Sequence, residues 1–102
     1  MNMIEQFEIL RDAICADNIQ HDTEIRHWDG VEPLKVGHIV TFAANCWNSV
    51  DSVESGTPAL VLALATTSSG VLKVNLQAAT SAYCYWMRFE HIRPLKRTEK
   101  TG

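Results

Sequence analysis

Histidine and cysteine are the residue types in this 102-residue chain that most readily carry chemistry, with four of the first and three of the second. Structural zinc sites use ligand pairs separated by about two to five residues. The nearest pairs here, His21 with His27 and Cys84 with His91, are six and seven positions apart. Neither spacing places both side chains on one side of a tight turn or helix. The sequence therefore predicts no metal site.

Cys46 is the best candidate for a nucleophile, because it lies beside Trp47 in a polar segment. A reactive thiol needs a base within hydrogen-bond distance, and either His38 or His91 would have to supply it. Nothing in the sequence brings these residues together. Glycine-rich phosphate-binding loops and the His-Glu-x-x-His motif are also absent from the sequence. We therefore expect no catalytic site and no cofactor.

Aromatic and basic residues interleave near the C-terminus, a pattern typical of barrels that bind single-stranded nucleic acid. The last fifteen residues carry a net charge of +3, whereas the first 32 carry −6. The total of −3 argues against nucleic-acid binding, because phosphate contacts dominate its affinity. The basic residues are as well suited to pair with the acidic N-terminal third. The candidate nucleic-acid-binding residues are Trp86, Arg88, Arg93, Lys96 and Arg97.

Protein binding is the function that we favour from the sequence. Trp47 lies in a long polar segment, residues 43–58, and Trp28 precedes the predicted strands. Tryptophan is enriched where protein interfaces concentrate their binding energy, and long loops of small domains are often functional. The alternative is that each tryptophan folds back to cap the core. Ile9 is a third candidate, because it lies opposite the apolar stripe of the predicted N-terminal helix and offers a homodimer contact.

The elements that position these residues begin with a helix predicted over residues 3–16. Asn2 suits its N-cap position, and Glu5 stands where a capping box places an acidic residue. The apolar residues recur at the helical repeat. They are Met3, Ile4, Phe7, Leu10 and Ile14.

Residues 18–33 are predicted to be a polar connection, in which residues 23–28 form a short strand or a helical turn. Apolar patterning then predicts strands over residues 36–42, 59–66, 71–77 and 83–89, and a short last strand around Ile92. Gly37 favours a bulge near the start of the first strand. Gly70 favours a hairpin turn between the second and third strands, because it accommodates positive φ.

The strand over residues 83–89 alternates two sets of side chains. Tyr83, Tyr85, Met87 and Phe89 lie on one face, with Cys84, Trp86 and Arg88 on the other. Which face is buried decides whether Trp86 belongs to the core or to a binding surface.

This order of elements resembles the SH3-like barrel superfold over about residues 34–95. The resemblance implies a small, mostly antiparallel barrel of about five strands, a fold that hosts many unrelated functions. The N-terminal helix is an addition to that fold. The segments that carry the resemblance are Val36-Gly37-His38-Ile39-Val40, residues 60–64 and 72–76 as the central hairpin, and Trp86 with Ile92-Arg93-Pro94-Leu95.

We therefore expect one α+β domain, with a helix over residues 1–17, a connection over 18–33, a barrel over 34–96 and a flexible tail over 97–102. No apolar run reaches the roughly 18 residues of a membrane span. The expected protein is a cytoplasmic, non-enzymatic binding or adaptor module that forms a homodimer, in the manner of accessory bacterial, phage or mobile-element gene products.

Two other functions remain open at this point. The first is a nucleic-acid-binding barrel that uses the aromatic-basic segment. The second is an oligomeric small-barrel enzyme, because the chain resembles plasmid-borne dihydrofolate reductases in size and strand order. The Val-Gln-Ile-Tyr motif of those enzymes is absent from this sequence.

Overall fold

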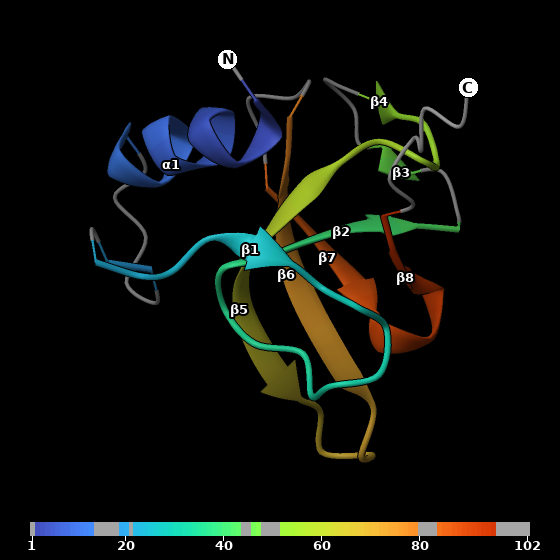
Figure 1. The fold of residues 1–102 in the computed structure, drawn as a ribbon. Helices are drawn as coiled ribbons and strands as arrows, with labels where there is room; N and C mark the ends of the chain where they lie inside the picture. Colours follow the sequence, from blue (N-terminus) through green and yellow to red (C-terminus); the bar gives the residue numbers. More distant parts are fainter. Residues whose placement is uncertain are drawn as a thin grey trace.

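The computed structural model describes residues 2–13, 19–20, 22–43, 46–47, 52–79 and 84–95. Its centre is a mixed six-stranded sheet, and the helix α1 (Met3–Ala13) packs on one face of it. In the view of Figure 1, α1 lies at the upper left, and the β5–β6 hairpin points downward, away from it.

Five strands follow one another across the sheet, and a sixth pairs with the second of them. The order is β1 (Arg26–His27), β2 (His38–Phe42), β5 (Ala59–Thr66), β6 (Leu72–Ala78) and β7 (Cys84–Arg88), with β8 (Ile92–Pro94) also on β2. The β1–β2 pair is parallel, and the other pairs of this sheet are antiparallel. A separate antiparallel pair consists of β3 (Cys46–Trp47) and β4 (Ser52–Val53).

The sheet does not close into the expected barrel. Over the described ranges, β7 pairs with β6 alone and β8 with β2 alone. The short 3-10 helix η1 (Phe89–His91) joins β7 to β8. The α+β class and the mostly antiparallel sheet are confirmed, whereas a closed SH3-like barrel is not.

The helix begins as the sequence predicts. Asn2 Oδ1 accepts the Glu5 backbone N–H at 2.8 Å, and Asn2 Nδ2 donates to Glu5 Oε1 at 2.9 Å. These bonds satisfy a donor that the first helical turn otherwise leaves unpaired. Phe7 is the fully buried residue of α1. The predicted last turn, residues 14–16, lies outside the described residues.

The strand predictions agree closely with the structure. The bounds of β5 coincide with the predicted 59–66, and Gly70 has the expected positive φ (88°) in the turn to β6. Residues 23–28 were predicted to form either a short strand or a helical turn, and they contain the short strand β1. The expected bulge near Gly37 is instead a turn that precedes β2, since β2 begins only at His38. The long segment 43–58 contains β3 and β4.

The sheet separates two apolar clusters. One contains Phe7 of α1 together with Ile39, Leu60 and Leu62 of the sheet. The other lies on the opposite face and includes Val40, Val61, Val74 and Trp28, among others. Each cluster takes alternate residues of the same strands, which explains why β5 is apolar along most of its length.

Candidate functional site

The face of β7 that carries Trp86 is open to solvent. Tyr85 and Met87 belong to the cluster that contains Val40 and Trp28, which we call the inner apolar cluster. Cys84, Trp86 and Arg88 point to the other side and are exposed. Trp86 retains 52 % of its accessible surface. A large aromatic residue with that exposure is a candidate contact for a partner.

The pairing of β7 with β6 sets the neighbours of Trp86. Trp86 lies opposite Asn75, and Arg88 lies opposite Lys73. Residues that face each other in an antiparallel pair have Cβ atoms about 5 Å apart. These two neighbouring pairs form one patch of four side chains on the same face of the sheet, which we call the Trp86 surface. Its members are Trp86, Asn75, Lys73 and Arg88.

The Trp86 surface is on the same side of the sheet as α1. Leu60, which packs in the cluster with Phe7, lies opposite Gln77, and Gln77 lies opposite Cys84. Cys84 and Trp86 are two residues apart on β7 and so share a face. The helix covers one part of this face and leaves the part around Trp86 open.

The electrostatics of the Trp86 surface favour an anion. Lys73 and Arg88 are like charges placed directly opposite each other, an arrangement that destabilises an antiparallel pair. The carboxylate of Glu90 offsets part of this charge, with Oε1 at 3.5 Å from Arg88 Nη1. Both partners are well exposed, so solvent screens the ion pair and its contribution is small. An anionic group bound here would relieve the repulsion between the two cations.

Polar groups on β6 complete the surface. Asn75 Oδ1 is buried and accepts no hydrogen bond within the described part of the chain. Gln77 Oε1 accepts the Cys84 thiol at 3.2 Å. Burial raises the pKa of Cys84, which keeps this thiol protonated and poorly nucleophilic.

Beside Arg88, an open depression of about 330 Å³ is lined by Val71, Leu72, Phe89 and Glu90.

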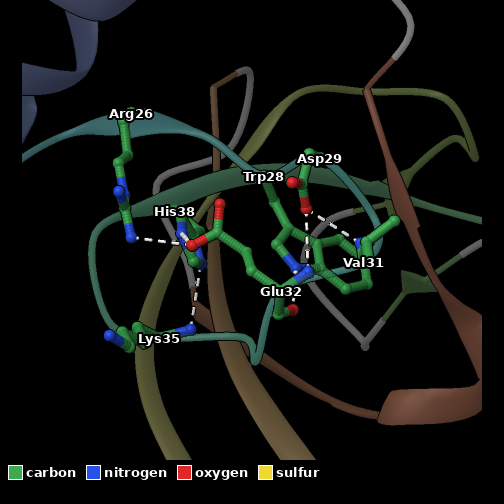
Figure 2. Close-up of polar contacts among 7 residues, drawn as sticks. All are labelled: Arg26, Trp28, Asp29, Val31, Glu32, Lys35 and His38. Atoms are coloured by element: carbon green, nitrogen blue, oxygen red, sulfur yellow. Dashed lines mark hydrogen bonds and ion pairs between the residues drawn. The ribbon is translucent and has the colours of Figure 1, made fainter.

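Trp28 lies in the core, with 6 % of its surface accessible. Its indole Nε1 donates to the Glu32 carbonyl at 2.8 Å, and its ring meets Phe89 edge-on at a centroid distance of 6.0 Å. Figure 2 shows the indole within the outline of the loop that runs from Asp29 to Lys35. This is the alternative in which the tryptophan folds back, and it leaves Trp28 unable to serve as an exposed contact.

The loop of residues 29–35, which we call the strap, carries a second polar cluster (Figure 2). Arg26 Nη2 lies 2.8 Å from Glu32 Oε1, and His38 Nε2 lies 3.6 Å from the same oxygen. Asp29 Oδ1 accepts the backbone N–H groups of residues 31 and 32 at 2.8 and 2.9 Å. These two bonds favour the charged carboxylate and lower the pKa of Asp29.

The remaining predicted contacts are dispersed. Ile9 is 56 % exposed on α1. Arg93 is exposed, and its Nη1 donates to the carbonyls of Glu90 and Ile92 at 2.6 and 2.9 Å, so local backbone holds its guanidinium. Trp47 belongs to β3, but its side chain lies outside the described residues, as do Lys96 and Arg97. The structure brings Trp86 and Arg88 together and adds Lys73 and Asn75, which the sequence reasoning missed.

The ligand-type residues do not gather into a centre. Across the described ranges, no three His, Cys, Asp or Glu residues lie close enough to hold a metal ion. The proposed thiol of Cys46 lies outside the described side chains, so its relation to His38 and His91 stays a prediction. No helix in the described part of the chain has the length and apolar character needed to cross a bilayer.

Comparisons with protein-family models, with curated proteins and with solved structures found no match to this chain. The case for a function therefore depends on the geometry of the Trp86 surface and the strap.

Proposed function

We propose that this chain is a non-enzymatic binding protein, and that its Trp86 surface binds an acidic segment of a protein partner. One observation carries the proposal: a half-exposed tryptophan lies beside two opposed cations on an open sheet face. The indole supplies apolar contact area, and the cations select negative charge. Asn75 lies opposite Trp86 and supports the indole from the neighbouring strand.

A protein partner is favoured over nucleic acid by the charge near the surface. Glu90 lies within 3.5 Å of Arg88, and the whole chain carries −3. Strong phosphate binding requires a larger positive field than two cations and a neighbouring carboxylate provide. A short acidic peptide needs only the two cations.

Selection from a displayed library of random peptides tests this function directly. We expect the selected peptides to be rich in Asp and Glu. Trp86→Ala should weaken their binding at least about 30-fold, the effect of losing a contact worth about 2 kcal/mol. Val31→Ala is the matched control, because it also removes an exposed apolar side chain, but from the strap. Equal binding by wild type and Trp86→Ala would refute the proposal.

Binding of single-stranded nucleic acid is a second candidate, supported by the placement of an aromatic ring beside cations on an open sheet face. A labelled oligothymidylate is the probe. Because Lys73 and Arg88 offer two phosphate contacts, the logarithm of its association constant should fall with the logarithm of salt concentration with a slope of about −1.4. Tight, salt-dependent binding that Lys73→Glu abolishes would favour this candidate over the peptide.

The arrangement of strands supports a relation to the SH3-like superfold, which we propose as the finer description of the fold. β2 pairs with β5 on one side and β8 on the other, and a 3-10 turn separates the last two strands. Self-association at Ile9 is a separate expectation. Light scattering would test it, since Ile9→Glu should halve the mass of a dimer formed through α1.

A further inference from the structure

His38 occupies an unusual place for a titratable side chain. It is the first residue of β2, only 1 % of its surface is accessible, and Glu32 and Lys35 of the strap reach its ring (Figure 2). Its Nδ1 accepts the Lys35 backbone N–H at 2.9 Å. Because an acceptor nitrogen carries no proton, the ring is neutral with its proton on Nε2, which lies 3.6 Å from Glu32 Oε1.

Glu32, in the middle of the strap, contacts two residues outside the strap. The Glu32 carbonyl accepts the Trp28 indole N–H, and its carboxylate pairs with Arg26. Among the described residues, the strap is held at Glu32, by Trp28 and Arg26, and at Lys35, by His38. At Lys35 the His38 ring accepts the backbone N–H, and the His38 backbone N–H donates to the Lys35 carbonyl at 3.2 Å. The bonds from Asp29 are within the strap itself.

Protonation of His38 is incompatible with this arrangement. A proton on Nδ1 would point at the Lys35 N–H, so two donors would face each other where a hydrogen bond now exists. The new charge would also be buried, near the cations of Arg26 and Lys35. The carboxylates of Glu32 and Asp29 oppose these two effects.

We propose that the strap is an acid-sensitive latch: protonation of the His38 ring breaks its hydrogen bond to the Lys35 N–H and releases residues 29–34, while the turn closed by the His38 N–H and the Lys35 carbonyl acts as the hinge. Release uncovers Trp28 and the side of the Phe89 ring that Trp28 contacts. The device is independent of the Trp86 surface, which lies on the opposite face of the sheet.

The direction of the pH dependence follows from the burial of the ring. Burial, the largest influence, lowers the pKa of His38 below its ordinary 6.5, and Arg26 and Lys35 lower it further, while Glu32 and Asp29 raise it. The folded state therefore binds this proton less readily than the unfolded chain does. The stability that the neutral ring contributes is present above the unfolded pKa and is lost as the pH falls through the folded pKa.

Hydrogen exchange followed by NMR, from about pH 7.5 to 4.5, tests the latch on the full chain. The Lys35 amide and the Trp28 indole N–H should lose protection together, with a midpoint below 6.5. The amides of β5 and β6 should stay protected over the same range. Simultaneous loss across β5 and β6, or continued protection of Lys35 until the whole sheet unfolds, would overturn the proposal.

Two variants separate His38 from other groups. His38→Asn keeps an acceptor close to the position of Nδ1 and removes the titration, so the Lys35 amide should stay protected at every pH in that range. Glu32→Gln removes the nearest carboxylate, whose negative charge stabilises the protonated ring. The midpoint of the pH transition should therefore move to lower pH. A midpoint unchanged by His38→Asn, or raised by Glu32→Gln, would contradict the latch. Should His38→Asn fail to fold, the direction of the Glu32→Gln shift still decides.

Discussion

Trp28 and Trp86 lie on opposite faces of the sheet, and their indoles differ in burial and in contacts. Trp28 is enclosed by the inner apolar cluster, its Nε1 donates to a backbone carbonyl, and its ring contacts Phe89. Trp86 has half of its surface in solvent, beside two cations and an amide oxygen that lacks a hydrogen bond within the described part of the chain.

The two regions differ in how far the chain itself satisfies the contacts of the tryptophan. Around Trp28, apolar contacts and polar bonds come from the chain itself, so this region contributes stability. Around Trp86, like charges face each other across β6 and β7, so the region would gain from an added anionic ligand. The contrast gives Trp28 a structural role and supports the proposal that Trp86 contacts a partner.

The largest expected effect comes from truncating each tryptophan in turn. Trp28→Ala should lower the free energy of unfolding by about 3–5 kcal/mol, because it leaves a cavity in the core. Trp86→Ala should change it by no more than about 0.5 kcal/mol, as is usual for exposed positions. Urea denaturation measures both. Similar losses in the two variants would remove the contrast.

A second substitution tests the region where the strap enters β2. Gly37 has a φ of 100°, and a Cβ there would lie 2.3 Å from the Glu24 carbonyl oxygen. Gly37→Ala should therefore cost about 3 kcal/mol, from backbone strain and this overlap. Gly70→Ala is the matched control, because its φ is 88° but nothing lies within 4 Å. That variant should cost about 1 kcal/mol, and equal costs would show that Glu24 moves aside freely.

The third prediction concerns the unpaired oxygen beside Trp86. Asn75→Val removes it and places a residue of high β-propensity on β6, so stability should rise by up to about 1 kcal/mol. Because Asn75 lies opposite Trp86, the substitution should also weaken binding of the selected acidic peptides. A thermal melt and a titration of the peptide measure the two effects. Improved stability with unchanged binding would exclude Asn75 from the binding surface.

The smallest effect is expected at the ion pair beside the depression. Arg88 and Glu90 are exposed, so a double-mutant cycle with Arg88→Gln and Glu90→Gln should give a coupling below about 1 kcal/mol that decreases with added salt. Glu90→Gln should also strengthen binding of an acidic peptide, since it removes a competing carboxylate. A coupling that salt does not change would show that the pair is shielded from solvent.

Local signals in the sequence predicted the regular elements well. The helix start depended on Asn2 and Glu5, which bond each other within three residues, and the β5–β6 hairpin depended on Gly70. Such contacts are legible because both partners are close in sequence. Closure of the barrel is different, because it requires β7 and β8 to pair across η1, and no residue pattern reports on that pairing.

The site was only partly predictable for the same reason. Trp86 and Arg88 were identified from β7 alone, but Lys73 joins them only through the β6–β7 register. Trp28 carried no sign of its burial, because its hydrogen-bond acceptor is a backbone carbonyl. Its position depends on the parallel pairing of β1 with β2, which joins residues twelve positions apart.

The irregularity in β5 has a consequence for changes in chain length. Val61 lies opposite Leu76 and Ala63 opposite Asn75, so Leu62 is an additional residue in the ladder. Deletion of Leu62 would leave both neighbouring pairs, and therefore both sheet faces, in register. Deletion of Leu64 would exchange the faces of the residues that follow it, because side chains alternate along a strand. The strand thus has one position where the chain can shorten by a residue without loss of register, at the cost of one buried leucine side chain from the cluster that contains Phe7.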